Sequence, residues 1–129
     1  MDAWTALGEG KYLLVTTFKR DGTPVATPVW VAVDGTDLVF WTVRDSWKVK
    51  RLRRDPRVEV GPSDLRGNPL GPSTAARARL LDDPTSERVR RLIQRKYGIL
   101  GRLTIGGSRL RRGTKGTIGV AISQDPPPA

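Results

Sequence analysis

The side chains best suited to chemistry in this 129-residue chain are basic residues that follow an apolar run. Residues Leu38 to Val43 are rich in β-branched and aromatic types, as strands are, and Ser46 shortly after them can cap a helix. The first backbone N–H groups of a helix lack partners within it and carry a partial positive charge. Lys48, Lys50 and Arg51 fall within the first two turns. The stretch therefore predicts a binding position for an anionic group.

This helix is expected to begin after Asp45 or Ser46, which are both good N-cap residues, and to end before Pro56. A simpler interpretation is a short amphipathic helix whose charges are only solvated, with Val49 and Leu52 as its inward anchors. The pattern alone leaves both interpretations open.

The chain contains no cysteine and no histidine. Disulfides, zinc sites built from these residues, thiolate nucleophiles and Ser-His-Asp arrangements are therefore excluded, and no metal site is predicted. We expect either a binding module or an enzyme whose bound cofactor supplies the reactive group. The net charge of +10 favours an anionic partner.

Length and composition favour one globular domain, residues 1–123, followed by a flexible Pro-rich tail, residues 124–129. No apolar run approaches the roughly 20 residues of a membrane-spanning helix. The residues after Met1 lack the basic and apolar regions of a secretory signal. We therefore expect no membrane partner and a cytoplasmic location.

Three strand patterns surround these residues. Lys11 to Phe18 and Pro24 to Val33 are joined by a turn containing Asp21-Gly22, and a second turn leads into the strand at Leu38 to Val43. These three strands are expected to form an antiparallel meander. Pro28 has no N–H group, so its part of the strand is predicted to lie at a sheet edge, at a bulge or beside a ligand.

The second helix is predicted from Asp83, as its cap, to Gly98. One face is apolar at helical spacing and the other is basic and expected to be solvated. The apolar face holds Val89, Leu92, Ile93 and Tyr97, and the basic face holds Arg88, Arg90, Arg91, Arg95 and Lys96. The glycine-punctuated residues 99–113 receive no assignment.

The other expected elements are a short helix capped by Asp2 that directs Trp4 and Leu7 inward, and strands at Arg57 to Pro62, Ser73 to Leu81 and Thr114 to Ser123. Six short strands with short helices predict a mainly β protein, a small antiparallel barrel. Such a barrel is too small to enclose a cofactor, so a ligand is expected in an outer groove completed by a second copy of the chain.

Several motifs in one order and spacing carry a resemblance to a known family. They are Gly22-Thr23-Pro24, Ala26-Thr27-Pro28-Val29-Trp30-Val31, Phe40-Trp41-Thr42, Ser46-Trp47-Lys48-Val49-Lys50-Arg51-Leu52 and Asp55-Pro56-Arg57-Val58. Their combination resembles the pyridoxamine 5′-phosphate oxidase-like superfamily, and within it the actinobacterial branch that uses the deazaflavin coenzyme F420. The resemblance implies a split β-barrel homodimer with cofactor sites at the subunit interface.

The resemblance also implies roles for individual residues. Pro28, Val29 and Trp30 would line the ring, and Trp41 and Thr42 would lie near the linker and phosphate of the cofactor. Ser46 and Lys48 would bind the phosphate. The glutamate tail of coenzyme F420 would need further cations, for which Lys50, Arg51 and Arg54 are candidates, although at 100° per residue these three point away from the helix's buried stripe.

The activity implied is reduction of a small electron-poor acceptor by hydride from the reduced coenzyme. Trp47 stands where the oxidase has a basic residue, which disfavours FMN, and no substrate-phosphate signature of the oxidase is recognisable near the C-terminus. An FMN-binding oxidoreductase, a non-catalytic flavin or deazaflavin carrier and a nucleic-acid-binding barrel remain as alternatives. The last is disfavoured because the basic residues lack interleaved aromatic residues. The catalytic residues are not identified: a proton could come from water, Tyr12, Tyr97 or a lysine.

Overall fold

The computed structural model describes the backbone of residues 2–112 and 116–124, and the side chains of residues 2–98 and 116–124. Residues 125–129 of the predicted tail and the predicted first residues of the last strand, 114 and 115, lie outside this description. The elements follow in the order α1 (Ala3–Glu9), β1 (Tyr12–Phe18), β2 (Pro24–Val29), β3 (Ala32–Asp34), β4 (Asp37–Val43), α2 (Trp47–Arg54), β5 (Arg57–Ser63), β6 (Thr74–Leu80), α3 (Asp83–Arg112) and β7 (Thr117–Gln124).

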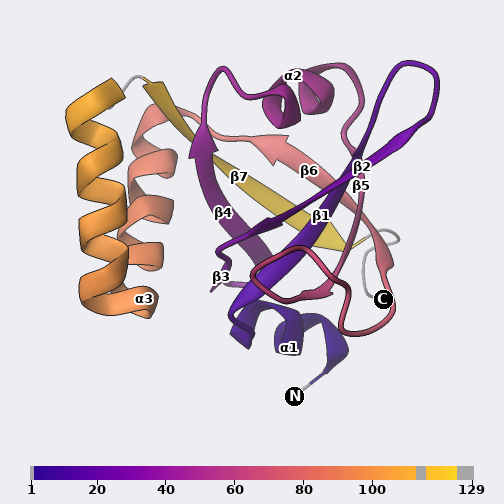
Figure 1. The fold of residues 1–129 in the computed structure, drawn as a ribbon, viewed down its shortest axis with the longest axis horizontal. Helices are drawn as coiled ribbons and strands as arrows, with labels where there is room; N and C mark the ends of the chain where they lie inside the picture. Colours follow the sequence, from indigo (N-terminus) through magenta and orange to yellow (C-terminus); the bar gives the residue numbers. More distant parts are fainter. Residues whose placement is uncertain (1, 113–115, 125–129) are drawn as a thin grey trace.

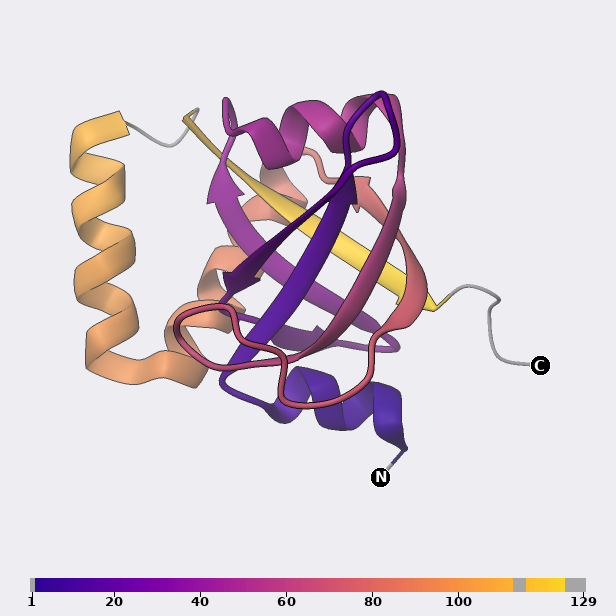
Figure 2. The same cartoon turned by 45° about the vertical axis from the view of Figure 1, so that its right-hand side comes forward.

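The seven strands form one antiparallel sheet in the order β2-β1-β5-β6-β7-β4-β3. The sheet curls into a half-barrel with α1 at one end, α2 at the other and α3 along one side (Figures 1 and 2). The mainly β, antiparallel architecture is confirmed, but the sheet has seven strands rather than the six expected. Within the described residues, no helix is both long and apolar enough to span a membrane.

The extra strand arises because the predicted strand Pro24 to Val33 is broken at Trp30 and Val31. β2 pairs with β1, and β3 pairs with β4, so the two halves of the predicted strand lie at opposite edges of the sheet. Both antiparallel pairings of the predicted meander therefore occur, but its middle strand is split, so the three strands do not lie side by side. β4 has β3 on one side and β7 on the other. Pro28 lies in an edge strand, which is one of the positions expected for it.

The break is held by the first half of α3. The Lys96 ammonium donates hydrogen bonds to the carbonyl oxygens of Gly8, Gly10 and Val31 at 2.7, 2.6 and 2.6 Å. The Tyr97 hydroxyl accepts a hydrogen bond from the Val31 N–H at 3.0 Å and donates to the Lys11 carbonyl at 2.6 Å. These side chains therefore satisfy backbone groups of Val31 that a continuous strand would have paired in the sheet.

Lys96 is exposed, as predicted for the basic face, but its ammonium also reaches back to three carbonyls, which the sequence did not predict. Arg90 departs from the predicted solvated face: it is only 9% exposed and bonds to Glu87. The apolar stripe of the helix is confirmed, with Val89 and Ile93 buried against the outer face of the sheet. The cap is Asp82 rather than Asp83, since the Asp82 carboxylate accepts from the Thr85 N–H at 2.9 Å.

Strand alternation separates two apolar clusters. Leu38 and Phe40 of β4 point into the barrel, whereas Val39 points outward beneath α3.

The close approach of α3 to the sheet depends on Gly119 in β7, because a Cβ atom there would lie 3.1 Å from the Ser86 Cα. At Gly98, α3 turns sharply, with φ 64° and ψ −141°, and Figure 2 shows its two helical legs.

Replacing Lys96 by methionine should lower the free energy of unfolding by about 2 kcal/mol, because three backbone carbonyls lose a charged donor, two of them in partly buried hydrogen bonds. Arg95→Met is the matched control, since Arg95 is exposed on the same helix, and it should change stability by less than about 0.5 kcal/mol. Denaturant unfolding of both variants measures the difference. Equal stabilities would contradict the role assigned to Lys96.

Candidate functional site

Helix α2 begins and ends as the sequence predicts. The Ser46 hydroxyl oxygen caps it by accepting a hydrogen bond from the Val49 N–H at 3.3 Å, and the Asp55 N–H closes its last turn on the Arg51 carbonyl at 2.8 Å. Val49 and Leu52 are buried and anchor the helix to the barrel. The other residues of α2 line two separate hollows on the protein surface.

The first of these surfaces is a hollow of about 370 Å³ that we call the aromatic hollow. It brings together six of the predicted site residues: Pro28, Val29, Trp30, Trp41, Thr42 and Lys48. Tyr12, Val43, Leu65, Ile93 and Thr117 complete its lining. Sequence reasoning did not name these five as lining residues, because they come from β1, β4, the β5–β6 loop, α3 and β7 and meet only in the folded chain.

Two aromatic rings at the hollow are held rigidly. Trp30 stacks on Tyr97 with ring centroids 4.3 Å apart and planes 7° from parallel. Burial raises the pKa of the Tyr97 phenol, so it remains protonated and donates to the Lys11 carbonyl. Tyr97 thus supports one wall of the hollow, whereas Tyr12 lines it directly.

Lys48 is the cation of the aromatic hollow. Its side chain is partly buried, and among the described residues its ammonium has no hydrogen-bond or ion-pair partner. Burial, and secondly the positive charge of Arg51, lower the pKa of Lys48 below the ordinary lysine value. An anion bound beside Lys48 would offset both effects, and the N-terminus of α2 adds a favourable dipole there.

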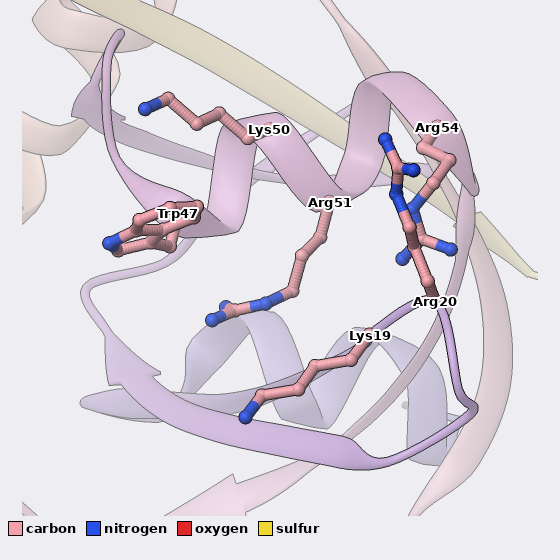
Figure 3. A pocket seen from close by; sticks show the side chains of 6 residues that line it. All are labelled: Lys19, Arg20, Trp47, Lys50, Arg51 and Arg54. Atoms are coloured by element: carbon pink, nitrogen blue, oxygen red, sulfur yellow. The ribbon is translucent and has the colours of Figure 1, made fainter.

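The second surface, which we call the basic cleft, has a volume of about 640 Å³. It lies between α2 and the turn that joins β1 to β2, and it is lined by Lys19, Arg20, Trp47, Lys50, Arg51 and Arg54 (Figure 3). Lys50 and Arg51, which were predicted to act with Lys48, therefore line a different hollow. Lys19 and Arg20 were missed because only tertiary structure brings their turn beside α2.

Among the described residues, no cation of the basic cleft forms an ion pair, although Lys19 lies near the Asp21 carboxylate and Arg54 near that of Asp55. Arg51 donates to the Thr17 hydroxyl at 3.4 Å and Arg54 to the Phe18 carbonyl, both of which are neutral acceptors. The Lys50 ammonium lies 4.5 Å from the centre of the Trp47 ring. Of the neighbouring carboxylates, Asp55 forms an ion pair with Arg57. The cleft is thus suited to an anionic ligand.

Ser46 is the one predicted site residue that lines neither hollow, and its hydroxyl oxygen is engaged in the helix cap. Throughout the described residues there is no group of three or more acidic side chains that could hold a metal ion. The arrangement offers an aromatic hollow that contains one cation and, bordered by other residues of α2, a cationic cleft. These features suit a ligand with an aromatic ring and anionic groups.

Comparison with solved structures finds the same fold in several proteins at low identity. An F420 reductase is 20% identical, with 95% of this chain and 93% of that chain covered and a TM-score of 0.60. A conserved hypothetical protein from Mycobacterium tuberculosis is 20% identical, covering 96% and 81%, with a TM-score of 0.69. A heme storage protein from Vibrio cholerae is 14% identical, covering 87% and 80%, with a TM-score of 0.62.

A search of curated proteins finds no match. The family description that matches is "Pyridoxamine 5′-phosphate oxidase", and the match extends over residues 4–117, from α1 to the start of β7. It thus spans the whole curled sheet up to its last strand and both hollows beside α2. The resemblance carried by the short motifs is confirmed at this level: the chain belongs to the pyridoxamine 5′-phosphate oxidase family.

Proposed function

We propose that this protein is a reductase that uses reduced coenzyme F420 to transfer a hydride to a small electron-poor organic acceptor. The observation that carries the proposal is the pairing of the aromatic hollow with a basic cleft across α2. A deazaflavin ring needs a flat apolar surface, whereas the phosphodiester and glutamate tail of the coenzyme need several cations.

The residues fit the coenzyme in three parts. Pro28, Val29 and Trp30 offer a surface for the ring, with Trp41 on the neighbouring wall. Lys48 and the N-terminus of α2 suit the phosphodiester. The cations of the basic cleft suit the carboxylates of the tail.

FMN is the alternative cofactor, since it shares the ring and phosphate but has no tail. It would occupy the aromatic hollow and leave the basic cleft without a role. The five cations of that cleft exceed what one phosphate can neutralise, which favours the coenzyme with more anionic groups. The heme storage protein with this fold cautions against assigning a cofactor from fold alone, so the assignment rests on the two hollows.

The coenzyme would supply the hydride, and the chain would position it. The apolar lining of the hollow excludes water from the ring face and holds the acceptor against it. Tyr97 is committed to backbone groups, which leaves Tyr12, Lys48 and solvent as proton sources at the hollow. The side chains of the hollow thus orient the reactants, and the proton comes from one of these three sources.

We further propose that two copies of the chain complete each site. Leu65, which lines the aromatic hollow, is 69% exposed. Leu70, in the same β5–β6 loop, is 67% exposed. Large apolar side chains exposed together suit a protein–protein contact, and a second copy would cover both.

Tryptophan fluorescence should be quenched by coenzyme F420 at micromolar or lower concentration, and FMN should bind more weakly, because the basic cleft adds contacts for the tail. Parallel titrations of the purified protein measure this. A preference for FMN would move the assignment to a flavin enzyme, and no response to either cofactor would refute the proposed function. Turnover of an acceptor with the reduced coenzyme then separates an enzyme from a carrier.

Lys48→Gln should weaken binding of coenzyme F420 about tenfold, or ~1.4 kcal/mol, since it removes one charge-assisted hydrogen bond. Arg53→Gln, on the exposed face of the same helix, should change the affinity less than about twofold.

The affinity for coenzyme F420 should also depend on pH, because Lys48 contributes to binding only while its amine is protonated. This contribution to affinity should be lost as the pH rises through the lowered pKa of Lys48, at a lower pH than for a lysine with the ordinary pKa of 10.5. The Lys48→Gln variant should lack this pH dependence.

Leu70→Glu should convert the protein from a dimer to a monomer, because it buries a charge in the proposed contact. Light scattering after size exclusion should give twice the chain mass of 14.2 kDa for the wild type and about one chain mass for the variant. Ala6→Glu adds the same charge at an exposed position of α1 and should leave the dimer intact. A monomeric wild type would contradict the proposal.

A further inference from the structure

We infer that the basic cleft is a polyanion-binding site in its own right, which selects ligands by the number of their anionic groups, and that Lys19 and Arg20 of the β1–β2 turn form one wall of it. The expected ligand is an elongated molecule carrying several phosphates or carboxylates. If that molecule is the coenzyme tail, the inference rests on the proposed function. The cations of the cleft could equally bind a polyanion that is not part of the coenzyme.

The two walls of the cleft are fixed relative to each other. Arg51 and Arg54 of α2 bond to Thr17 and Phe18 at the end of β1, so the helix is tied to the strand that leads into the turn. The turn itself is closed by the Lys19 N–H, which donates to the Thr23 carbonyl at 3.0 Å. The two walls are therefore held in place before any ligand binds, which lowers the entropy cost of binding.

Charge makes the cleft selective. Its five cations come from two elements, and among the described residues none of them forms an ion pair. Asp21 lies near Lys19 and Asp55 lies near Arg54, so two negative charges face five positive ones and a net positive charge remains. Asp21, in the same turn, uses its carboxylate to accept the Thr23 N–H at 3.0 Å. A ligand with one anionic group can contact one wall, whereas a ligand with several can bridge both. Affinity should therefore rise steeply with the number of anionic groups and fall with salt.

The cleft is also separate from the aromatic hollow, because the two share no lining residue. Trp47 lines the cleft and is 69% exposed, whereas its neighbour Lys48 lines the hollow. One long ligand could occupy both surfaces across α2, or each could bind its own ligand. The source of the polyanion is thus either the coenzyme tail or a distinct phosphorylated molecule.

Calorimetric titration of the full chain at low salt tests the site with tripolyphosphate and inorganic phosphate as probes. Tripolyphosphate should bind with one site per chain and at least tenfold tighter than phosphate. The double substitution Lys19→Gln and Arg20→Gln should weaken tripolyphosphate at least tenfold without lowering the melting temperature, since it removes repelling charges. The control double substitution, Arg66→Gln with Arg95→Gln, removes two exposed charges outside the cleft. It should weaken tripolyphosphate binding less than twofold.

No preference for tripolyphosphate over phosphate, or an equal loss in both double variants, would overturn the inference, since binding would then follow overall charge. Competition between tripolyphosphate and coenzyme F420 would identify the tail as the occupant, and simultaneous binding would identify a separate phosphorylated ligand. Either result supports the site. If coenzyme F420 fails to bind at all, the proposed function fails while the tripolyphosphate result still decides this inference.

Discussion

The fold depends on how the chain satisfies the backbone at Val31, where one strand becomes two. An unbroken strand through Val31 could not form both edges of the curled sheet, where β2 pairs with β1 and β3 pairs with β4. The Tyr97 hydroxyl and the Lys96 ammonium instead bind the Val31 N–H and carbonyl, and the same ammonium binds the end of α1. The hydrogen bonds of two side chains thus join the first helix, the split in the barrel and α3.

The same contact shapes one side of the aromatic hollow. Trp30, next to the break, stacks on Tyr97 and lines the hollow with Pro28 and Val29 of edge strand β2. Because Pro28 lacks an N–H group, β2 is suited to the sheet edge, where its residues can border a ligand rather than another strand. The stability of the fold and the shape of the site therefore come from the same residues.

Helix α2 organises the charges. Its two buried anchors, Val49 and Leu52, hold it on the barrel end, while Lys48 faces one hollow and Lys50 and Arg51 face the other. A single short helix thereby separates an apolar surface with one cation from a cleft with five. This separation is what makes a ligand with distinct aromatic and polyanionic parts a better match than a compact one.

The local elements could be predicted from the sequence because each depends on neighbouring residues: the cap at Ser46, the apolar anchors of α2 and the strand at Leu38 to Val43. Composition alone excluded cysteine and histidine chemistry. The short motifs of the sequence also indicated the family. Three features could be seen only in the folded chain: where Pro24 to Val33 breaks, which carbonyls Lys96 binds, and that Lys48 and Lys50 line different hollows. Each of these depends on contacts between residues far apart in the chain, such as Val31 with Tyr97, which periodicity and local propensity do not encode.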